Sequence, residues 1–335
     1  MAKSNYAAWQ INPNSFSDDW DDSEKLKFFA RYAILAPSGH NTQPWRFTTK
    51  GTNLVLEAER SRHLPYSGVQ ANEPYVSLGA CLGTLELAAR GFGYKLAIHY
   101  DLMGDQVASI SLAGKVAAEA SLLEAITQRV SNRNFYDEAP LPAPFLKTIA
   151  ATESPQVSML ILNDRQDLEY VAKLTTEATL TTFADQAFRN ELSKWVRNNI
   201  TRQADGMPGF VQGIPTPVSL FARHVIKRLD VSKDQAKKDS SRVLHSSSLA
   251  VITIRDTSHA ALLDGGRTYA RLCILAQQQG VATTGVGAAI IDPDTTKEIT
   301  AKYQLPGKPI AIVRMGKTTK RARHTPRHDL SSVLR

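Results

Sequence analysis

Apolar residues follow two periods along this chain, and the pattern predicts both helices and strands. Apolar positions recur at helical spacing over residues 23–36, 75–90 and 122–129, and a shorter helix is expected at 145–151. Short apolar runs predict strands at 46–47, 54–57, 95–100, 106–113, 157–162, 249–254 and 310–315. Pro37 is expected to end the first helix, and Gly91 and Gly93 to end the second. Helices that alternate with strand hairpins favour an α+β sandwich.

The order of these elements recurs along the chain. Gly79 lies fourteen residues before Gly93, and Gly266 lies fourteen residues before Gly280. Each pair brackets a buried-looking helix closed by a glycine, which readily adopts the left-handed conformation of a helix C-cap. Two unrelated helices can share such spacing by coincidence. However, each half also has a helix that leads into a polar motif, and this favours two tandem halves.

The two polar motifs carry the candidate chemistry. The first is Ala-Pro-Ser-Gly-His-Asn-Thr-Gln-Pro-Trp at 36–45, and the second is Arg-Val-Ser-Asn-Arg-Asn-Phe at 129–135. Arg129 and Arg133 can meet a phosphate because the planar guanidinium makes paired, charge-assisted hydrogen bonds. The amides of Asn41 and Gln43 can donate and accept at once, which suits the edge of a polar ring. A phosphorylated, flat, polar-edged ring such as FMN fits both motifs; the alternatives are solvated cations at a helix end and side chains that cap a turn.

Both motifs resemble those of the FMN-dependent nitroreductase superfamily. In that family an R-x-S-x-R segment holds the flavin chain and phosphate, and a P-S-x-x-N-x-Q-P-W segment lines the cofactor. Here each motif occurs once and in the opposite order, which is similar to the Acg-like fused subgroup, where one chain mimics the family homodimer. The resemblance covers roughly residues 22–320. It implies an α+β nitroreductase-like fold with one half at 22–116, a second at 117–320 and a basic tail at 321–335.

The resemblance also implies a set of residues for one FMN per chain. A loop at Thr284 and Gly285 would pass close to flavin N5, where glycine permits the approach of the backbone. The family often has an acidic residue at the position of Thr284, so the effect on the flavin potential stays open. Basic residues near the C-terminus, here Arg323 and Arg327, would touch the phosphate. No catalytic side chain is required, because the cofactor carries the chemistry. The predicted cofactor-binding residues are Arg129, Ser131, Arg133, Pro37, Ser38, Asn41, Gln43, Thr284, Gly285, Arg323 and Arg327.

A long insertion at about 183–245 separates two strands of the second half. It contains Asp205-Gly206-Met207-Pro208-Gly209, and such Gly- and Pro-punctuated segments within compact domains often serve as lids. In the Acg-like subgroup a similar insertion folds over the flavin, so Asp205, Gly206 and Met207 are expected in a lid. Two functions stay open. One is an FMN oxidoreductase that passes electrons from NAD(P)H to a nitroaromatic, a quinone or a similar acceptor; the other is an FMN store with a covered flavin.

Composition limits the other possibilities. The 335 residues are 42% hydrophobic and include two cysteines, which suits a large core in a reducing compartment. The start of the chain lacks an apolar signal-peptide core and no apolar run approaches a membrane span, so a soluble, cytoplasmic protein is expected. The net charge is +8, with a basic tail that could bind nucleic acid, be solvated or touch the cofactor. We expect no nucleic-acid, membrane or metal partner, but a small-molecule acceptor and a monomer or weak homodimer, since no helix-turn-helix or zinc pattern is present.

Overall fold

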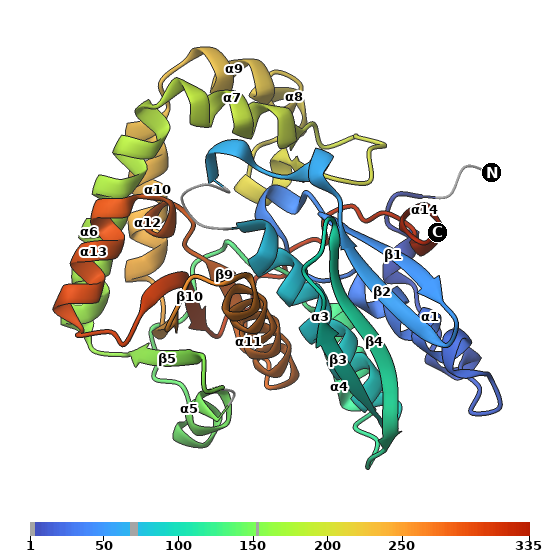
Figure 1. The fold of residues 1–335 in the computed structure, drawn as a ribbon. Coiled ribbons are helices and arrows are strands. Elements are labelled where there is room, and N and C mark those ends of the chain that lie inside the picture. The colour runs from blue at the N-terminus through green and yellow to red at the C-terminus, as the bar shows by residue number, and fades with distance from the viewer. Residues whose placement is uncertain (1–3, 68–72, 152–153) are drawn as a thin grey trace.

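The computed structural model describes residues 4–67, 73–151 and 154–335. Residues 1–3 belong to the start of the chain, where no signal peptide is expected, and they lie outside the described residues. Figure 1 shows two four-stranded sheets with two long helices, α3 (Glu73–Gly91) and α11 (His259–Gln278), between them. The layers run from one sheet through α3 and α11 to the other sheet, which is an α+β arrangement.

The first sheet has the strand order β1-β2-β4-β3, and every pair in it is antiparallel. Its strands are β1 (Trp45–Lys50), β2 (Asn53–Ala58), β3 (Tyr94–Tyr100) and β4 (Gln106–Lys115). Helix α1 (Asp22–Ala33) covers it and starts at a capping box, in which the Asp21 carboxylate accepts from the Glu24 amide. Buried Phe29, Trp45 and Phe47 fill the core between α1 and the strands.

The second sheet repeats this topology. Its strands are β5 (Val157–Leu162), β8 (Ser248–Ile254), β9 (Ala282–Gly285) and β10 (Lys308–Gly316), in the order β5-β8-β10-β9 and again antiparallel. Counted along each half, both sheets have the order 1-2-4-3, with the long helix between the second and third strands. The helices α5 (Ala143–Ala150), α12 (Ala288–Ile291) and α13 (Pro293–Lys302) complete this region.

The long helices cross at the glycines that the repeat singled out. A Cβ built on Gly266 would lie 2.1 Å from the carbonyl oxygen of Val76 and 2.9 Å from the Cα of Gly79. A Cβ on Gly79 would lie 2.1 Å from the carbonyl oxygen of Leu263. Since no side chain fits in this space, glycine at both positions lets α3 and α11 approach closely, and the crossing fixes the two sheets relative to each other.

The insertion differs from the irregular segment that the sequence indicates. It lies between β5 and β8 and is largely helical, and the long helix α6 begins it well before residue 183. In Figure 1, α6 and α10 stand side by side while α7, α8 and α9 cross above the centre of the molecule. Its elements are α6 (Arg165–Ala184), α7 (Gln186–Trp195), β6 (Val196–Arg197), β7 (Met207–Pro208), α8 (Thr216–Ser219), α9 (Ala222–Arg228) and α10 (Ser232–Leu244).

Two segments from outside residues 22–116 complete the core of the first half. Helix α4 (Ser121–Gln128) buries Leu122 and Ile126 against it, and the C-terminal α14 (Leu330–Val333) buries Val333 there. The backbone of Leu334 also forms a parallel bridge with Phe47 of β1. Among the described residues, no helix is long and apolar enough to cross a membrane.

Candidate functional site

Three of the segments predicted from sequence meet at one place. The guanidinium of Arg129, just after α4, donates to the carbonyl oxygen of Leu35 at 3.1 Å and so joins the second motif to the first. Ser131 forms a parallel bridge with Thr283 of β9, and the amide of Asn132 donates to the Thr283 carbonyl oxygen at 3.0 Å. The polar loop after α1, the R-x-S-x-R segment and β9 are therefore neighbours, although about 250 residues separate the ends of this set.

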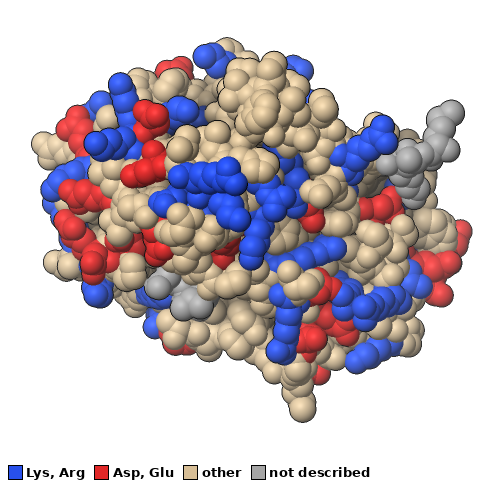
Figure 2. Space-filling model, turned by 90° about the horizontal axis from the view of Figure 1, so that it is seen from above, with Lys and Arg blue, Asp and Glu red and all other residues tan. Residues whose placement is uncertain are grey.

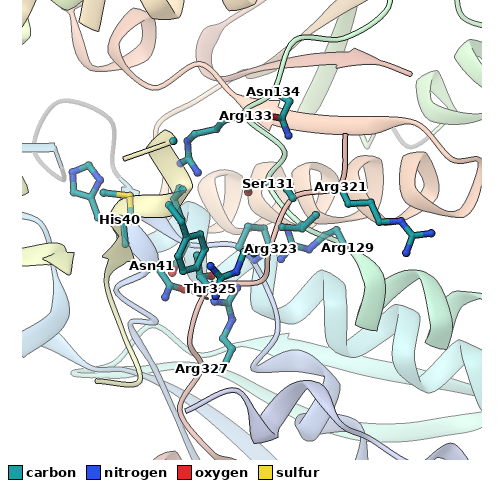
Figure 3. A pocket seen from close by; sticks show the side chains of 18 of the residues that line it. His40, Asn41, Arg129, Ser131, Arg133, Asn134, Arg321, Arg323, Thr325 and Arg327 are labelled. Atoms are coloured by element: carbon teal, nitrogen blue, oxygen red, sulfur yellow. Dashed lines mark hydrogen bonds between the residues drawn. The ribbon is translucent and has the colours of Figure 1, made fainter. Parts of the chain in front are cut away.

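A cavity of about 250 Å³, called here the cation cavity, lies where these segments meet. Figure 3 shows Arg129, Arg323 and Arg327 converging near Thr325, while Arg133 lies nearer His40 and Arg321 points away. Among the described residues, its wall includes arginines but no Asp or Glu, so the charge of the wall is positive. Arginines line it from three parts of the chain: Arg129, Arg133, Arg242, Arg321, Arg323 and Arg327.

The cations of this cavity differ in whether a carboxylate pairs with them. Within the described part of the chain, Arg242 pairs with Asp239 at 3.1 Å, but neither Arg129 nor Arg133 forms an ion pair. Burial lowers the pKa of Arg129, and burial together with the nearby Arg242 lowers the pKa of Arg133. A buried cation without a counter-charge is costly, and a bound anion would remove that cost. The arrangement therefore fits a phosphate-bearing ligand.

The loop of the first motif has an unusual backbone. His40, Asn41 and Gln43 have φ angles of 47°, 57° and 54°, in the left-handed region that non-glycine residues seldom adopt. Such residues cost on the order of 1–3 kcal/mol each and persist where other contacts hold them. Here the amide of Gln43 donates to Ser38 Oγ at 3.0 Å, and Arg62 donates to the Gln43 carbonyl oxygen at 3.1 Å.

The side-chain amides of this loop bind protein rather than the cavity. Asn41 Nδ2 donates to the carbonyl oxygens of Gly206 and Pro326 at 2.9 and 3.0 Å, and its Oδ1 accepts from Arg327. Gln43 Nε2 donates to the carbonyl oxygen of Ala204 at 2.7 Å, while its Oε1 accepts from the His328 amide at 3.0 Å. Both side chains thus join the insertion to the C-terminal tail. Asn41 still borders the cation cavity, whereas Gln43 is fully buried beneath it.

The predicted lid residues lie at this junction. The Gly206 amide donates to the Asn41 carbonyl oxygen at 3.1 Å, and Asp205 accepts from Arg197 at 2.6 Å. Met207 borders the cation cavity directly. A second attachment lies further along the insertion, where the buried carboxylate of Glu191 accepts from the amides of Tyr66 and Ser67. The insertion is therefore fastened to the first half at two places.

The two tail arginines differ in their roles. Arg327 is 4% exposed and donates to the carbonyl oxygens of Leu35, Ala36 and Pro326, so its guanidinium closes the end of α1 as well as the cavity. Helix α1 ends at Ala33, before Pro37, and the carbonyl oxygens of the turn after it accept from arginines. Arg323 is exposed and lies 4.1 Å above the Phe210 ring of the insertion.

A larger cavity of about 530 Å³, called here the inner chamber, adjoins the cation cavity. Pro37, Ser38, Ser131 and Arg133 belong to the walls of both. Thr284 and Gly285 also line the inner chamber, as the sequence predicts for a ligand-facing loop. A Cβ on Gly285 would lie 3.5 Å from the hydroxyl of Tyr269, so glycine leaves this part of the wall open.

His40 lies at the boundary between the cavities. Burial, with a smaller contribution from Arg133, lowers the pKa of His40 to about 4. The imidazole is therefore neutral at neutral pH and is not an acid there. Its ring lies 6.3 Å from that of Phe188 of α7, so it also forms a contact between the first motif and the insertion.

Four residues at or near the site could not be identified from the sequence pattern. Arg242 lies on the charged helix α10, and Arg321 is one cation among many in the tail. Arg314 of β10 donates to the carbonyl oxygen of Asn134 at 2.5 Å and lies 4.1 Å above the Tyr136 ring, which holds the R-x-S-x-R segment in place. Trp9 stacks on His324 at 3.9 Å between ring centres. A hydrophobic pattern cannot show such long-range contacts.

Comparison with known proteins gives matches along nearly the whole chain. No family model matches. Rv3131 of Mycobacterium tuberculosis, an NAD(P)H nitroreductase by name, is 24% identical over 96% of this chain and 94% of its own length. The acg protein of the same organism, with a similar name, is 24% identical over 88% and 89%. PigM of a Serratia species, also named as an NAD(P)H nitroreductase, is 24% identical over 90% of each chain.

Solved structures are more distant. A nitroreductase with bound FMN from Desulfitobacterium hafniense is 16% identical, with 62% of this chain and 93% of that chain covered and a TM-score of 0.39. NfnB of Mycobacterium smegmatis, an FMN-dependent nitroreductase in complex with NADPH, is 15% identical, with 64% and 97% covered and a TM-score of 0.39. The full-length matches decide the relationship: this chain is a relative of the Acg and Rv3131 proteins and, through them, of the nitroreductase family.

Proposed function

We propose that this protein binds FMN and acts as an oxidoreductase of the nitroreductase type, with NAD(P)H as reductant and a nitroaromatic, a quinone or a similar small molecule as acceptor. One observation carries the proposal: buried arginines without carboxylate partners line a cavity that opens into a larger, less polar chamber. A phosphorylated ring needs both environments. The names of the full-length relatives support the same activity.

The residues divide into two roles in this proposal. Arg129, Ser131, Arg133 and Arg323 hold the phosphate end, because their side chains line the cation cavity. Pro37, Ser38, Thr284 and Gly285 lie along the ring, because they line the inner chamber. When bound, FMN supplies the two-electron chemistry.

The remaining predicted residues support the wall of the site and do not bind the ligand themselves. Asn41, Gln43 and Arg327 fasten the insertion and the tail around the cavity, as their hydrogen bonds to Gly206, Ala204 and Leu35 indicate. In this arrangement the chain supplies positive charge, excludes water and positions the ring, and no side-chain acid is required.

We also infer that the two halves replace the two subunits of a family homodimer. The matching 1-2-4-3 sheets and the glycine-to-glycine crossing of α3 and α11 support an internal duplication. The second half supplies Arg129 and Arg133 and the first half supplies the loop after α1, so a single chain completes one site. A monomer is the expected functional unit, with weak self-association as the alternative.

A second function, FMN storage, is favoured by the fastening of the insertion. Asn41 and Gln43 bind residues 204–206 through several hydrogen bonds, and Glu191 holds α7 to the first half. A flavin under so firmly attached a cover would exchange electrons slowly.

The test is a visible absorption spectrum of the purified protein, followed by addition of NADPH without oxygen. Flavin bands that bleach with NADPH support the oxidoreductase. Bands that persist with NADPH but bleach with dithionite support storage. A colourless protein that takes up no added FMN contradicts both proposals.

A further inference from the structure

The inner chamber extends far beyond the residues that the motifs supply. Its wall continues from Ser38 and Gly285 to α7 and α9 of the insertion, which in Figure 1 cross above the strands. The side chains that α7 and α9 contribute to this wall are apolar, whereas α10 contributes polar ones such as Asp234 and Lys238. The apolar side chains of this outer part include Phe183, Phe188, Leu192, Val196, Ala222 and Ile226.

We propose that this chamber binds an electron acceptor with a hydrocarbon body, which enters beside α9. The identification of the ligand as an acceptor rests on the proposed function; the apolar nature of the site does not. A chamber of about 530 Å³ is in the size range of small-molecule sites, and its apolar part gives no partner to a polar ligand. An alkyl-substituted quinone has the required form, since it joins a polar ring to a hydrocarbon chain that can fill the outer part.

The entrance is marked by side chains that belong both to the chamber wall and to the surface. Val218 is 56% exposed and Val225 is 37% exposed, yet both line the chamber. Leu220 and Phe221 beside them are 48% and 65% exposed. Large apolar side chains rarely gather on the surface of a soluble protein unless something apolar binds there. The position of Val218 and Val225 therefore places the opening at α8 and α9.

The charge around this opening is positive. Arg223, Lys227 and Arg228 of α9 are exposed next to the apolar side chains. Figure 2 looks down on this end of the molecule and shows Lys and Arg interleaved with uncharged surface in the middle of the face. Like charges would meet if two copies joined through this face, so self-association is a poor explanation for the exposed apolar groups, whereas an uncharged small molecule meets no such repulsion.

The polar end of the chamber fits the other end of such a ligand. Gln235 and Lys238 of α10 line the same chamber, are not among the residues assigned to FMN, and can donate hydrogen bonds to a carbonyl oxygen. Reduction of a quinone to the hydroquinone takes two electrons and two protons. In the proposed function NAD(P)H supplies a hydride, and solvent supplies the second proton.

The test is the dissociation constant of naphthoquinones with a methyl, a pentyl or a nonyl chain, measured by equilibrium dialysis against FMN-loaded protein. The affinity is expected to rise with chain length, by up to about fourfold per methylene. Val225→Asp puts a charge in the wall and should weaken nonyl binding more than about tenfold, while methyl binding stays within about twofold. Leu229→Asp is the matched control: it lies one turn along on the surface and outside the wall, and should leave both unchanged.

Equal affinity for the methyl and nonyl compounds would overturn the proposal. So would an equal loss in Val225→Asp and Leu229→Asp, which would indicate adsorption to the surface. Val218→Asp gives a second wall variant if Val225→Asp fails to fold, as judged by circular dichroism. If the protein takes up no FMN, the proposed function fails, but the same chain-length series on flavin-free protein still decides whether the chamber binds hydrocarbon.

Discussion

The two polar motifs border the same cavity but use their side chains differently. In the first motif, the side-chain amides of Asn41 and Gln43 form hydrogen bonds with the insertion and the tail. The bonds to Gly206 and Ala204 span 165 and 161 residues. In the second motif, Arg129 and Arg133 have no carboxylate partner within the described residues and line the cavity. One motif assembles the site, and the other supplies its charge.

This difference shows that residue type does not determine a role by itself. An amide that suits the edge of a flavin suits a backbone carbonyl equally well, because both need the same donors and acceptors. A buried cation has fewer alternatives, since an unpaired charge is far more costly than an unpaired amide. The arginines are therefore the more reliable indicators of a ligand.

The largest expected effect comes from removing the charge of the second motif. Arg129→Ala combined with Arg133→Ala should weaken FMN binding at least a hundredfold, since each charge-assisted hydrogen bond contributes about 1.5–3 kcal/mol. Fluorescence titration with FMN measures this. Arg165→Ala, which removes an exposed arginine that does not line the cavity, serves as the control. Unchanged FMN affinity in the double variant would show that these cations do not hold the cofactor.

The two motifs meet only if the crossing of α3 and α11 holds the two halves together. Gly266→Ala should destabilise the fold by about 3 kcal/mol, because the new methyl group would overlap the Val76 carbonyl and the backbones would have to separate. Urea unfolding gives the change in free energy. Gly287→Ala meets nothing within 4 Å and should leave stability nearly unchanged. Equal stability of the two variants would mean that α3 and α11 can part without cost.

Asn41→Ala separates the two roles most directly. It removes one acceptor of Arg327 and the donor to the Gly206 carbonyl, so the free energy of unfolding should fall by about 2 kcal/mol while the FMN dissociation constant changes less than about tenfold. Asn53→Ala is a suitable control, because that amide makes a weak contact of 3.5 Å with Ser109. A large loss of FMN affinity without a loss of stability would instead place Asn41 at the flavin edge.

The smallest expected effect is a pH dependence from His40. Its pKa of about 4 in the folded chain lies below the ordinary value of 6.5, so the unfolded chain binds more protons between these values. This contribution to stability is present above about pH 6.5 and is lost as the pH falls towards 4, by about 1 kcal/mol per pH unit. His40→Gln should flatten this slope in urea unfolding curves recorded from pH 7 to pH 4.5. An identical slope in both proteins would mean that His40 is already protonated in the fold.

Sequence patterns predicted seven of the eight strands in the two described sheets, but only residues 46–47 of β1, and they missed β9. The run at 157–162 coincides with β5, and 249–254 is one residue short of β8. Helix α6 was not predicted either, since its many threonines, among them Thr175, Thr176 and Thr181, weaken its apolar pattern. In the structure their hydroxyls donate to carbonyl oxygens four residues earlier, which accommodates threonine within a helix.

The site was predictable as a set of segments but not as a set of contacts. The three segments meet as expected, and Arg129, Ser131 and Arg133 line the cavity. The partners of Asn41, Gln43 and Arg327 depend on how the insertion and the tail lie across the first half. Local sequence carries no information on contacts across such separations.

The path of the tail has a consequence for how the protein is made. Arg327 closes the turn at Leu35 and Ala36, His328 binds Gln43, and the amide of Arg335 donates to the Phe47 carbonyl oxygen at 2.9 Å. A ribosome synthesises these tail residues about 280 positions after the loop that they complete. The first half therefore emerges with part of its boundary missing, and the wall of the cation cavity is complete only after the tail has been translated.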